Sequence, residues 1–335
     1  MQILNGELVR SDLTKNARGG SELMAERLVA SLPQELLKEC QIVLSRGTNL
    51  LEDRCRIYWA HDLAGDPGAK ILENGGWKNF HRLVFVSYWQ RQQFMSYYNI
   101  PQSATVVIKN GIMPIEPQKK KSKKIKFIYH TTPHRGLNIL VPVFEQLARE
   151  FDNIHLDVYS SFKIYGWEHM DEQFKPLFNA IEDHPNMTYY GTKSNEEIRK
   201  VLPTYDVFAY PCTWPETSCL SLIEAMAAGL VCIHSDLAVL PETSADWNYM
   251  YPYNENTTAH ANMFLAYARH VLTELNKEDG KKQLQTRATM ASDYINSFYH
   301  WDTKAMNWRV LLEGAVHEPR EIPKTESLGD FIYSR

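Results

Sequence analysis

The sequence lacks the features that mark several common classes of protein. None of its apolar stretches approaches the roughly 20 residues that a membrane-spanning helix needs. Its five cysteines are scattered and odd in number, with neither a CxxC pair nor a Cys/His spacing typical of zinc, which disfavours a disulfide framework and a zinc site. The opening residues hold no long apolar run, so we expect no signal peptide and a reducing, cytoplasmic location.

An excess of charge of one sign is also missing. The formal net charge is −4, which gives no general attraction to nucleic acid or to an anionic membrane. No GxGxxG motif with an acidic residue about 20 positions later follows the first predicted strand, so a nicotinamide-dependent dehydrogenase is disfavoured. Hydrophobic residues make up 44% and charged residues 23% of the chain, as is usual for a globular protein.

The first third of the chain alternates short β-branched runs with helical patterns. The 335 residues are too many for one ordinary core and enough for two domains. The predicted strands of the first half are 41–45, 55–62, 83–87 and 104–111, and its predicted helices are 20–32 and 87–98. This alternation indicates a parallel sheet that is covered on both faces.

A stretch rich in proline and lysine, PIEPQKKKSKK (114–124), then interrupts the alternation. Its composition predicts a solvated linker, although a phosphate contact or a peripheral membrane contact stays open. Beyond it the predicted strands are 125–130, 155–161, 187–191, 206–211 and 231–235, the predicted helices are 137–150, 195–202 and 221–229, and the tail 258–313 is mostly helical. We therefore predict domains at 1–115 and 125–295, a linker at 116–124, and a tail at 296–335.

Unusual residues stand where predicted strands end, which is where open parallel sheets bind their ligands. In the first half, Gly19 and Gly20 precede a helix and would let a ligand approach the backbone, and His61 closes a strand that faces the expected cleft. In the second half, Arg135 comes just before Gly136 at a helix start. A fixed cation beside free backbone N–H groups suits a diphosphate.

The most informative segment is AYPCTWPETSCLSLIEAMAAGL (209–230), in which two glutamates stand eight residues apart. One alternative is purely structural: Ser221 and Glu224 fit a capping box, and Gly229 fits the C-terminal cap of the same helix. That alternative leaves Glu216 without a role, since this residue lies in the loop before the helix.

The same segment can also bind a ligand. Two carboxylates at different depths of a cleft can each accept hydrogen bonds from sugar hydroxyls. The backbone N–H groups near Ser218, Cys219 and Leu220 would meet a phosphate at the helix start. A sugar, a phosphate and a ribose held by one segment describe a nucleotide sugar.

The two α/β halves and the Glu-x7-Glu pair followed by EAMAAGL resemble the retaining glycosyltransferases of family 4. Further stretches occur in the order seen in that family, namely GGSE (19–22), the strand-end His61, FVS (85–87), VIKNGI (107–112), RGLNIL (135–140), YYGTKSNEEI (189–198) and YDVFAYPCTWPE (205–216). The resemblance spans nearly the whole chain. It implies an α/β protein with the GT-B fold, in which two Rossmann-like doubly wound domains face a central cleft and a C-terminal helix crosses back to the first domain.

The resemblance also implies a role for each candidate residue. Glu216 would contact the sugar of the donor, and Glu224 would hold the ribose of its nucleotide. Arg135 would neutralise the diphosphate, which Gly19 and Gly20 would allow to pack against the first half. Charge on the departing diphosphate would then be met by fixed groups.

The remaining implications concern the first half and the tail. His61 would lie near the reacting carbon or the acceptor, and the tail around Trp301 and Trp308 would brace the first domain. The resemblance implies no divalent metal at the reaction centre and no cofactor, only a UDP- or GDP-linked sugar as co-substrate.

The sequence departs from the family at two places. His130 occupies the position of a second basic residue that contacts the diphosphate, for which Lys193 or His134 could substitute. Ser218 and Cys219 stand where the family often has Phe-Gly. We interpret Cys212, Cys219 and Cys232 as packing residues near the donor site.

We therefore expect a metal-independent, retaining hexosyl- or pentosyltransferase that acts on a hydroxyl of a glycan, a lipid-linked or another acceptor, in glycan or polysaccharide biosynthesis. Two alternatives stay open, a transferase that glycosylates a hydroxylated DNA base and a non-catalytic protein that binds a nucleotide sugar. A glycoside hydrolase that uses Glu216 and Glu224 as acid and nucleophile gains little support from Arg135 and the two-sheet organisation.

Overall fold

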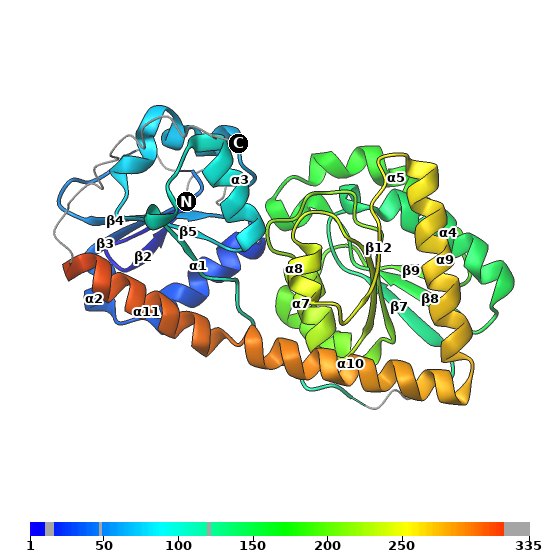
Figure 1. Ribbon diagram of the computed structural model, residues 1–335. Coiled ribbons are helices and arrows are strands. Elements are labelled where there is room, and N and C mark those ends of the chain that lie inside the picture. Colours follow the sequence, from blue (N-terminus) through cyan, green and yellow to red (C-terminus); the bar gives the residue numbers. More distant parts are fainter. Residues whose placement is uncertain (11–16, 47–48, 119–121, 318–335) are drawn as a thin grey trace, which may run out of the picture.

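The protein consists of two α/β halves joined by a hinge, as Figure 1 shows. The structure, a computed structural model, describes residues 1–10, 17–46, 49–118 and 122–317. Each half has one six-stranded sheet with its own hydrophobic core. The predicted α/β fold class is confirmed. Lys119, Lys120 and Lys121 of the predicted linker lie outside the described residues.

The sheet of the first half is parallel except at one edge. Its strands, in spatial order, are β2 (Glu7–Val9), β1 (Gln2–Leu4), β3 (Cys40–Leu44), β4 (Cys55–Ala60), β5 (Arg82–Phe85) and β6 (Thr105–Val107). β3 to β6 run parallel, as the alternation predicts, and His61 follows the last residue of β4 directly. The helices of this half are α1 (Gly20–Ser31), α2 (Gln34–Lys38) and α3 (Tyr88–Tyr98).

The prediction of a wholly parallel first sheet is wrong at this edge, because β1 pairs antiparallel with both β2 and β3. Asn5 and Gly6 join β1 to β2 with φ angles of 53° and 78°. Two residues with positive φ make the turn that matches the twist of a tight hairpin, and Asn-Gly favours it strongly. The dipeptide is thus a sequence feature from which the hairpin could have been predicted.

The sheet of the second half is parallel throughout. Its strands, in spatial order, are β12 (Tyr249–Tyr251), β11 (Val231–Ser235), β10 (Val207–Tyr210), β7 (Ile125–Tyr129), β8 (Ile154–Val158) and β9 (Met187–Tyr189). The helices are α4 (Leu137–Glu150), α5 (Lys175–Asp183), α6 (Asn195–Val201), α7 (Leu220–Ala227), α8 (Leu240–Ser244) and α9 (Thr257–Leu275). β10 and β11 are buried at every residue, as expected of central strands that helices cover on both faces.

The last two helices tie the halves together along one side of the molecule (Figure 1). α10 (Glu278–Phe298) packs on α7 of the second half, and α11 (Trp301–His317) packs on the first. Trp308 lies against Trp59 of β4 with ring centroids 4.6 Å apart, and the Trp301 indole N–H donates to the Ser31 hydroxyl at 2.7 Å. The crossing back of the C-terminal helix is therefore confirmed.

The two chain crossings between the halves pair with each other. Ile112 of the outgoing segment donates its N–H to the Tyr299 carbonyl at 2.8 Å, and its own carbonyl accepts from Trp301 N–H at 2.8 Å. Because both crossings meet at one point, the two halves share a single hinge.

Candidate active site

The centre of the candidate site is a buried ion pair between Arg135 and Glu216 at the carboxyl ends of β7 and β10. The Arg135 guanidinium donates to Glu216 Oε1, and the Tyr210 hydroxyl donates to the same oxygen. Glu216 is 5% exposed. Burial is the largest single influence and acts to lower the pKa of Arg135, but the Glu216 carboxylate together with Tyr165 and Tyr210 raises this pKa well above its ordinary value. No described residue bonds to Glu216 Oε2, so this oxygen can accept from a ligand.

Gly136 explains how Arg135 reaches that position. The φ of Gly136 is 117°, a backbone conformation that residues with a side chain rarely adopt. A Cβ at this position would lie 2.0 Å from the Pro211 carbonyl oxygen. Only glycine therefore lets the loop after β7 lie directly on the backbone that follows β10. This close contact sets Arg135 beside Glu216, although 81 positions separate them in the chain.

Glu224 lies on α7, deeper in the second half, and is 2% exposed. The Asn195 side-chain N–H groups lie 3.0 and 2.9 Å from its two carboxylate oxygens, and the Arg199 guanidinium donates to Oε1 at 3.0 Å. The capping-box alternative is wrong, because the Ser221 hydroxyl donates instead to the His130 carbonyl and the α7 N-cap is Cys219. The second part of that alternative holds, since Gly229 follows α7 with φ of 75°.

The start of α7 lies between these carboxylates. Ser218 and Cys219 precede the helix, and Leu220 is its first residue. The first N–H groups of a helix have no partner within it and favour an anion. Cys212, Cys219 and Cys232 are all buried, which agrees with their interpretation as packing residues. Burial raises the pKa of the Cys212 thiol to about 12, so it is no nucleophile near neutral pH.

Four buried polar atoms of the loop that carries Arg135 have no hydrogen-bond partner among the described residues, namely His130 Nε2, Thr132 Oγ1, His134 Nδ1 and Arg135 Nε. Burial lowers the pKa of His130 to about 3 and that of His134 to about 4, so both rings are neutral at pH 7. His134 stacks on Phe162 with ring centroids 5.1 Å apart. Lys193 is 41% exposed and lies 3.8 Å from Glu197, so of the two named substitutes His134 is the one beside Arg135.

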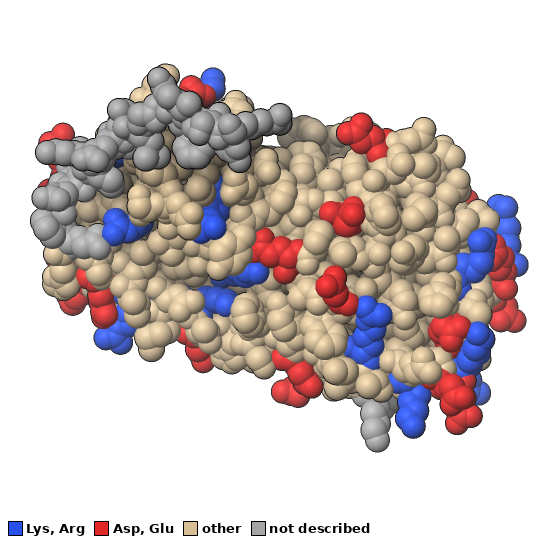
Figure 2. All heavy atoms as spheres, viewed as in Figure 1, with Lys and Arg blue, Asp and Glu red and all other residues tan. Residues whose placement is uncertain are grey.

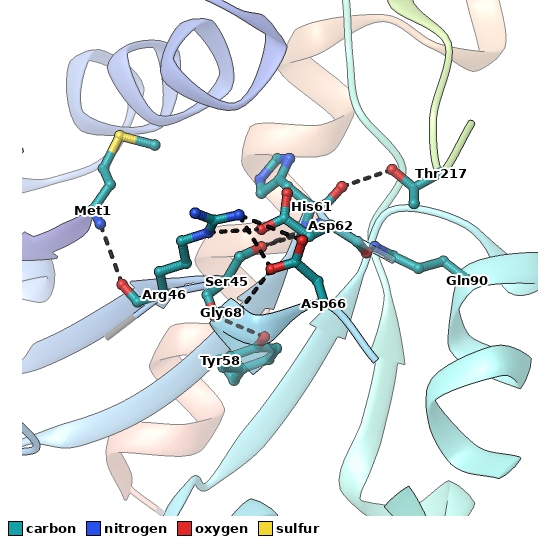
Figure 3. A network of polar contacts seen from close by, with 10 residues as sticks. All are labelled: Met1, Ser45, Arg46, Tyr58, His61, Asp62, Asp66, Gly68, Gln90 and Thr217. Carbon is teal, nitrogen blue, oxygen red and sulfur yellow. Dashed lines mark hydrogen bonds and ion pairs between the residues drawn. The ribbon is translucent and has the colours of Figure 1, made fainter. Parts of the chain in front are cut away.

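His61 of the first half meets the loop that carries Glu216. The Thr217 hydroxyl donates to the His61 carbonyl at 2.8 Å, across 156 positions of sequence (Figure 3). Burial lowers the pKa of His61 to about 3, and its Nε2 has no partner among the described residues. The His61 ring lies against Trp59 with centroids 4.6 Å apart. A neutral imidazole therefore lies at the junction of the halves.

A polar network positions the His61 segment from below (Figure 3). The Ser45 hydroxyl accepts the N–H groups of His61 at 2.8 Å and of Asp62 at 3.2 Å. Arg46 lies 3.5 Å from the Asp62 carboxylate and 3.1 Å from that of Asp66. Ser45 has a φ of 52°, so this turn is held in an uncommon conformation that aims its hydroxyl at the strand end.

Gly19 and Gly20 lie against the second half. A Cβ on Gly19 would come within 2.7 Å of the Tyr165 ring, and one on Gly20 within 3.0 Å of Leu220 at the start of α7. Tyr165 also lies 3.4 Å from Arg135, with its hydroxyl accepting from the guanidinium. The structure thus brings the glycine pair to the same place as the α7 start and Arg135.

A second contact between the halves involves Glu242 of α8. Its carboxylate accepts the N–H groups of Tyr88 at 3.0 Å and Trp89 at 2.9 Å, at the start of α3 in the first half. It also forms an ion pair with Lys109 at 2.8 Å, and both side chains are largely buried. A carboxylate at a helix start is favourable for the helix dipole.

Sequence reasoning missed the partners of the candidate residues. Tyr210, Asn195 and Arg199 bond the two glutamates, whereas Thr217 and Glu242 bridge the halves. The capping box from Ser194 to Glu197 predicts the start of α6 but not where Asn195 points. Only the folded structure, in which Asn195 of α6 bonds Glu224 of α7, shows where this side chain points.

The described residues include neither a metal-binding cluster nor a membrane-spanning helix. No described group of three or more His, Cys, Asp or Glu side chains could hold a metal ion. None of the described helices is both long enough and apolar enough to cross a membrane. On the face in Figure 2, basic and acidic side chains of the described residues are interspersed, and no continuous basic stripe follows the surface.

Comparison with known proteins adds the decisive observation. Residues 109–267, just under half of the chain, match the family model described as "Glycosyl transferases group 1". The second half is thus similar to a glycosyl transferases group 1 domain. The matched range includes both glutamates, Arg135 and the outgoing crossing of the hinge at Ile112. No curated protein matches the chain.

Solved structures of glycosyltransferases show that the chain has the GT-B fold across both halves. A glycosyltransferase from Rickettsia africae matches with a TM-score of 0.66 and 14% identity, over 93% of this chain and 85% of that one. Sucrose-phosphate synthase from Thermosynechococcus elongatus matches with 0.62 and 15%, over 78% and 68%. Anabaena HepE in complex with UDP-glucose matches with 0.61 and 13%, over 87% and 77%.

Proposed function

We propose that the protein is a retaining glycosyltransferase that moves a sugar from a nucleoside diphosphate sugar to an acceptor hydroxyl. The observation that carries the proposal is the arrangement of Glu216 and Glu224. Each is buried, each is held by a different arginine, and both lie on one segment of a glycosyl transferases group 1 domain. Anabaena HepE, of similar fold, was crystallised with UDP-glucose, which supports a nucleotide sugar as the donor.

The proposed donor contacts follow from the chemistry of the groups. Glu216 Oε2 accepts from a hydroxyl of the transferred sugar, because Oε1 already holds Arg135 and Tyr210. Arg135 presents its unpartnered Nε to the diphosphate. The backbone N–H groups at the start of α7 donate to the same diphosphate. Glu224 accepts from the ribose hydroxyls. Gly20 lets the first half close over the donor without a side chain in between.

The remaining candidates have proposed roles at the edges of this site. His130 Nε2, buried and unpartnered, is placed to donate to a phosphate oxygen once the imidazole is in the right tautomer. His61 lies on the side of the first half and would contact the reacting carbon or the acceptor.

In the proposed reaction, the bond from the anomeric carbon to the diphosphate oxygen breaks and a bond to the acceptor oxygen forms on the same face. The acceptor proton passes to the departing diphosphate oxygen. Arg135 and the helix-start N–H groups stabilise the charge that develops there, which is worth about 10²- to 10³-fold in rate for a single well-placed donor. The protein side chains need not act as base, and we propose that no metal ion is required.

The test is turnover with a panel of UDP- and GDP-linked hexoses and pentoses and simple glycan acceptors, measured by release of nucleoside diphosphate. We expect one donor to be consumed, with the anomeric configuration retained in the product by NMR. Glu216→Gln should lower the rate at least about 10²-fold, and the exposed Glu313→Gln on α11 should leave it unchanged. Thermal protection by a donor without turnover would indicate a binding protein instead, and sugar release without a nucleotide donor would indicate a hydrolase.

A further inference from the structure

The first half has a cavity that the proposed reaction does not use. The cavity has a volume of about 560 Å³ and lies where the segment Pro67–Asn79 meets the end of α3. This volume is in the range of ligand sites, roughly 300–1,000 Å³. Neither His61 nor any candidate residue of the second half is among the described residues that line it. The cavity is therefore separate from the candidate active site.

Three aromatic side chains line this cavity, namely Trp77, Tyr97 and Tyr98. Trp77 and Tyr98 are 4% and 7% exposed, whereas Tyr97 is 60% exposed. The ring centroids of the two tyrosines are 4.7 Å apart in an edge-to-face arrangement. The exposed ring of Tyr97 keeps apolar surface in contact with water, and a ligand with an apolar face would cover that surface.

Four polar side chains line the same cavity, namely Glu73, Asn74, Lys78 and Asn99. The amides of Asn74 and Asn99 form no hydrogen bond with another described residue, so each can both donate to a ligand and accept from it. Glu73 and Lys78 carry opposite charges, which gives no net attraction for the phosphates of a nucleic acid. The described lining residues include no Val, Leu, Ile or Met, so an acyl chain does not fit the cavity.

An exposed aromatic ring beside free amides has the chemistry of a carbohydrate site. A sugar ring presents C–H groups on its faces and hydroxyls around its edge. It can therefore cover the Tyr97 ring and bond the amides of Asn74 and Asn99 at the same time.

Gly65 connects the cavity to the segment that begins at His61. Its N–H donates to the Tyr98 hydroxyl at 3.1 Å, and a Cβ at this position would lie 3.2 Å from the Tyr97 ring. His61 and Gly65 are four positions apart in the chain, so the two lie at most about 14 Å from each other. A glycan chain can span the space between His61 and the cavity, whereas a single sugar occupies only one of the two places.

We propose that this cavity is a carbohydrate-binding subsite, which holds a distal unit of a glycan acceptor while the reacting unit lies at His61. The inference rests on the proposed function, since it takes the protein as a glycosyltransferase whose acceptor binds the first half. It names the acceptor as a glycan of several units, and not as a lipid chain or DNA. The affinity for the acceptor then grows with its length.

The experiment measures dissociation constants for malto-, cello- and chito-oligosaccharides of one to six units by calorimetry. In at least one series, wild type should bind the hexasaccharide at least about 10-fold more tightly than the monosaccharide, because the longer glycan also covers Tyr97. Tyr97→Ala should reduce this preference to less than about threefold. Tyr97→Phe should keep it, because the ring is retained.

Asn99 provides a second variant that leaves the backbone undisturbed. This residue is the C-cap of α3 and has a φ of 53°, which glycine adopts freely. Asn99→Gly therefore removes only the amide, and it should weaken the hexasaccharide about 3- to 10-fold without changing the monosaccharide. Phe298→Ala is the matched control, because it removes an aromatic ring of α10 that is 54% exposed and lies outside the cavity.

The remaining outcomes contradict the proposal. If no series binds more tightly at six units than at one, or if Tyr97→Ala and Asn99→Gly leave the preference intact, the cavity is not a glycan subsite. If nucleotide-sugar turnover is found without any preference for length, the inference alone fails. If the glycans bind as expected but the protein neither binds nor consumes a nucleotide sugar, the proposed function fails, and the cavity is not an acceptor subsite.

Discussion

The two halves hold their candidate residues in different ways. In the second half, Glu216 and Glu224 are buried and each is bonded by two side chains of the same half. In the first half, His61 Nε2 has no partner among the described residues, and the nearby Arg46 and Asp62 are 48% and 36% exposed. Under the proposed function, the second half is organised in advance for a donor of fixed chemistry, and the first half is left open for an acceptor.

The largest loss of stability should follow from breaking the buried ion pair of the second half. Glu216→Ala leaves the Arg135 guanidinium buried without its carboxylate, which should lower the free energy of unfolding by about 3–5 kcal/mol. Urea unfolding followed by circular dichroism measures this. Tyr210→Phe, which removes one uncharged donor to the same carboxylate oxygen and leaves the ion pair, should cost about 1.5–3 kcal/mol. Equal losses for both variants would mean that the charge of Arg135 is not buried as the structure shows.

The halves should behave alike in their response to acid. His61 and His130, one in each half, have pKa values near 3 in the folded state because they are buried, against an ordinary value of about 6.5. The unfolded state therefore binds protons first as the pH falls below about 6.5, and stability is lost down to about pH 3.

Between pH 7 and pH 5, each histidine should remove about 2 kcal/mol of stability. Unfolding free energies of wild type, His61→Gln and His130→Gln at both pH values test this, and each substitution should flatten the dependence by a similar amount. A dependence that does not change in one variant would show that its histidine is open to water in that half.

Glu242 tests the contact between the halves. Glu242→Ala removes the acceptor of two N–H groups at the start of α3 and the partner of Lys109, which should cost about 1–2 kcal/mol, as for a lost helix cap. The radius of gyration from small-angle X-ray scattering should rise because the halves separate more easily. Glu182→Ala, an exposed residue of α5, is the control. Unchanged scattering would show that the hinge and α11 alone keep the halves together.

The smallest effect is expected for Asp62→Asn in the first half. Asp62 pairs with Arg46 at a partly exposed site, where an ion pair is worth about 0.2–1 kcal/mol. Urea unfolding should therefore change little, and a change in turnover should appear in the KM of the acceptor and not in that of the donor. A loss of stability as large as that of Glu216→Ala would remove the contrast between the two halves.

Much of the fold could be predicted from local patterns. The helix at Leu137–Glu150 and the strand at Val231–Ser235 have the predicted bounds, because a continuous apolar run or a helical period is a property of neighbouring residues. The β1–β2 hairpin was missed although Asn5-Gly6 is a strong hairpin feature, and the antiparallel edge follows from it.

For the candidate site, too, only the features that depend on neighbouring residues could be predicted. The spacing of Glu216 and Glu224, the glycine at position 136 and the helix start after Cys219 are readable in the sequence, because each depends on a few adjacent residues. The sequence could not show whether Glu224 caps its own helix or faces a ligand, because Ser221 and Glu224 fit the capping-box spacing in either case.

The partners of these residues depend on contacts between segments far apart in the chain. Arg135 reaches Glu216 over 81 positions, Asn195 reaches Glu224 over 29, and Thr217 reaches His61 over 156. Local patterns carry no information on such distances, because sheet order and hinge closure place the segments. Residue types and their spacing thus indicated a nucleotide-sugar site, and the packing of the two halves determined which side chains hold its carboxylates in place.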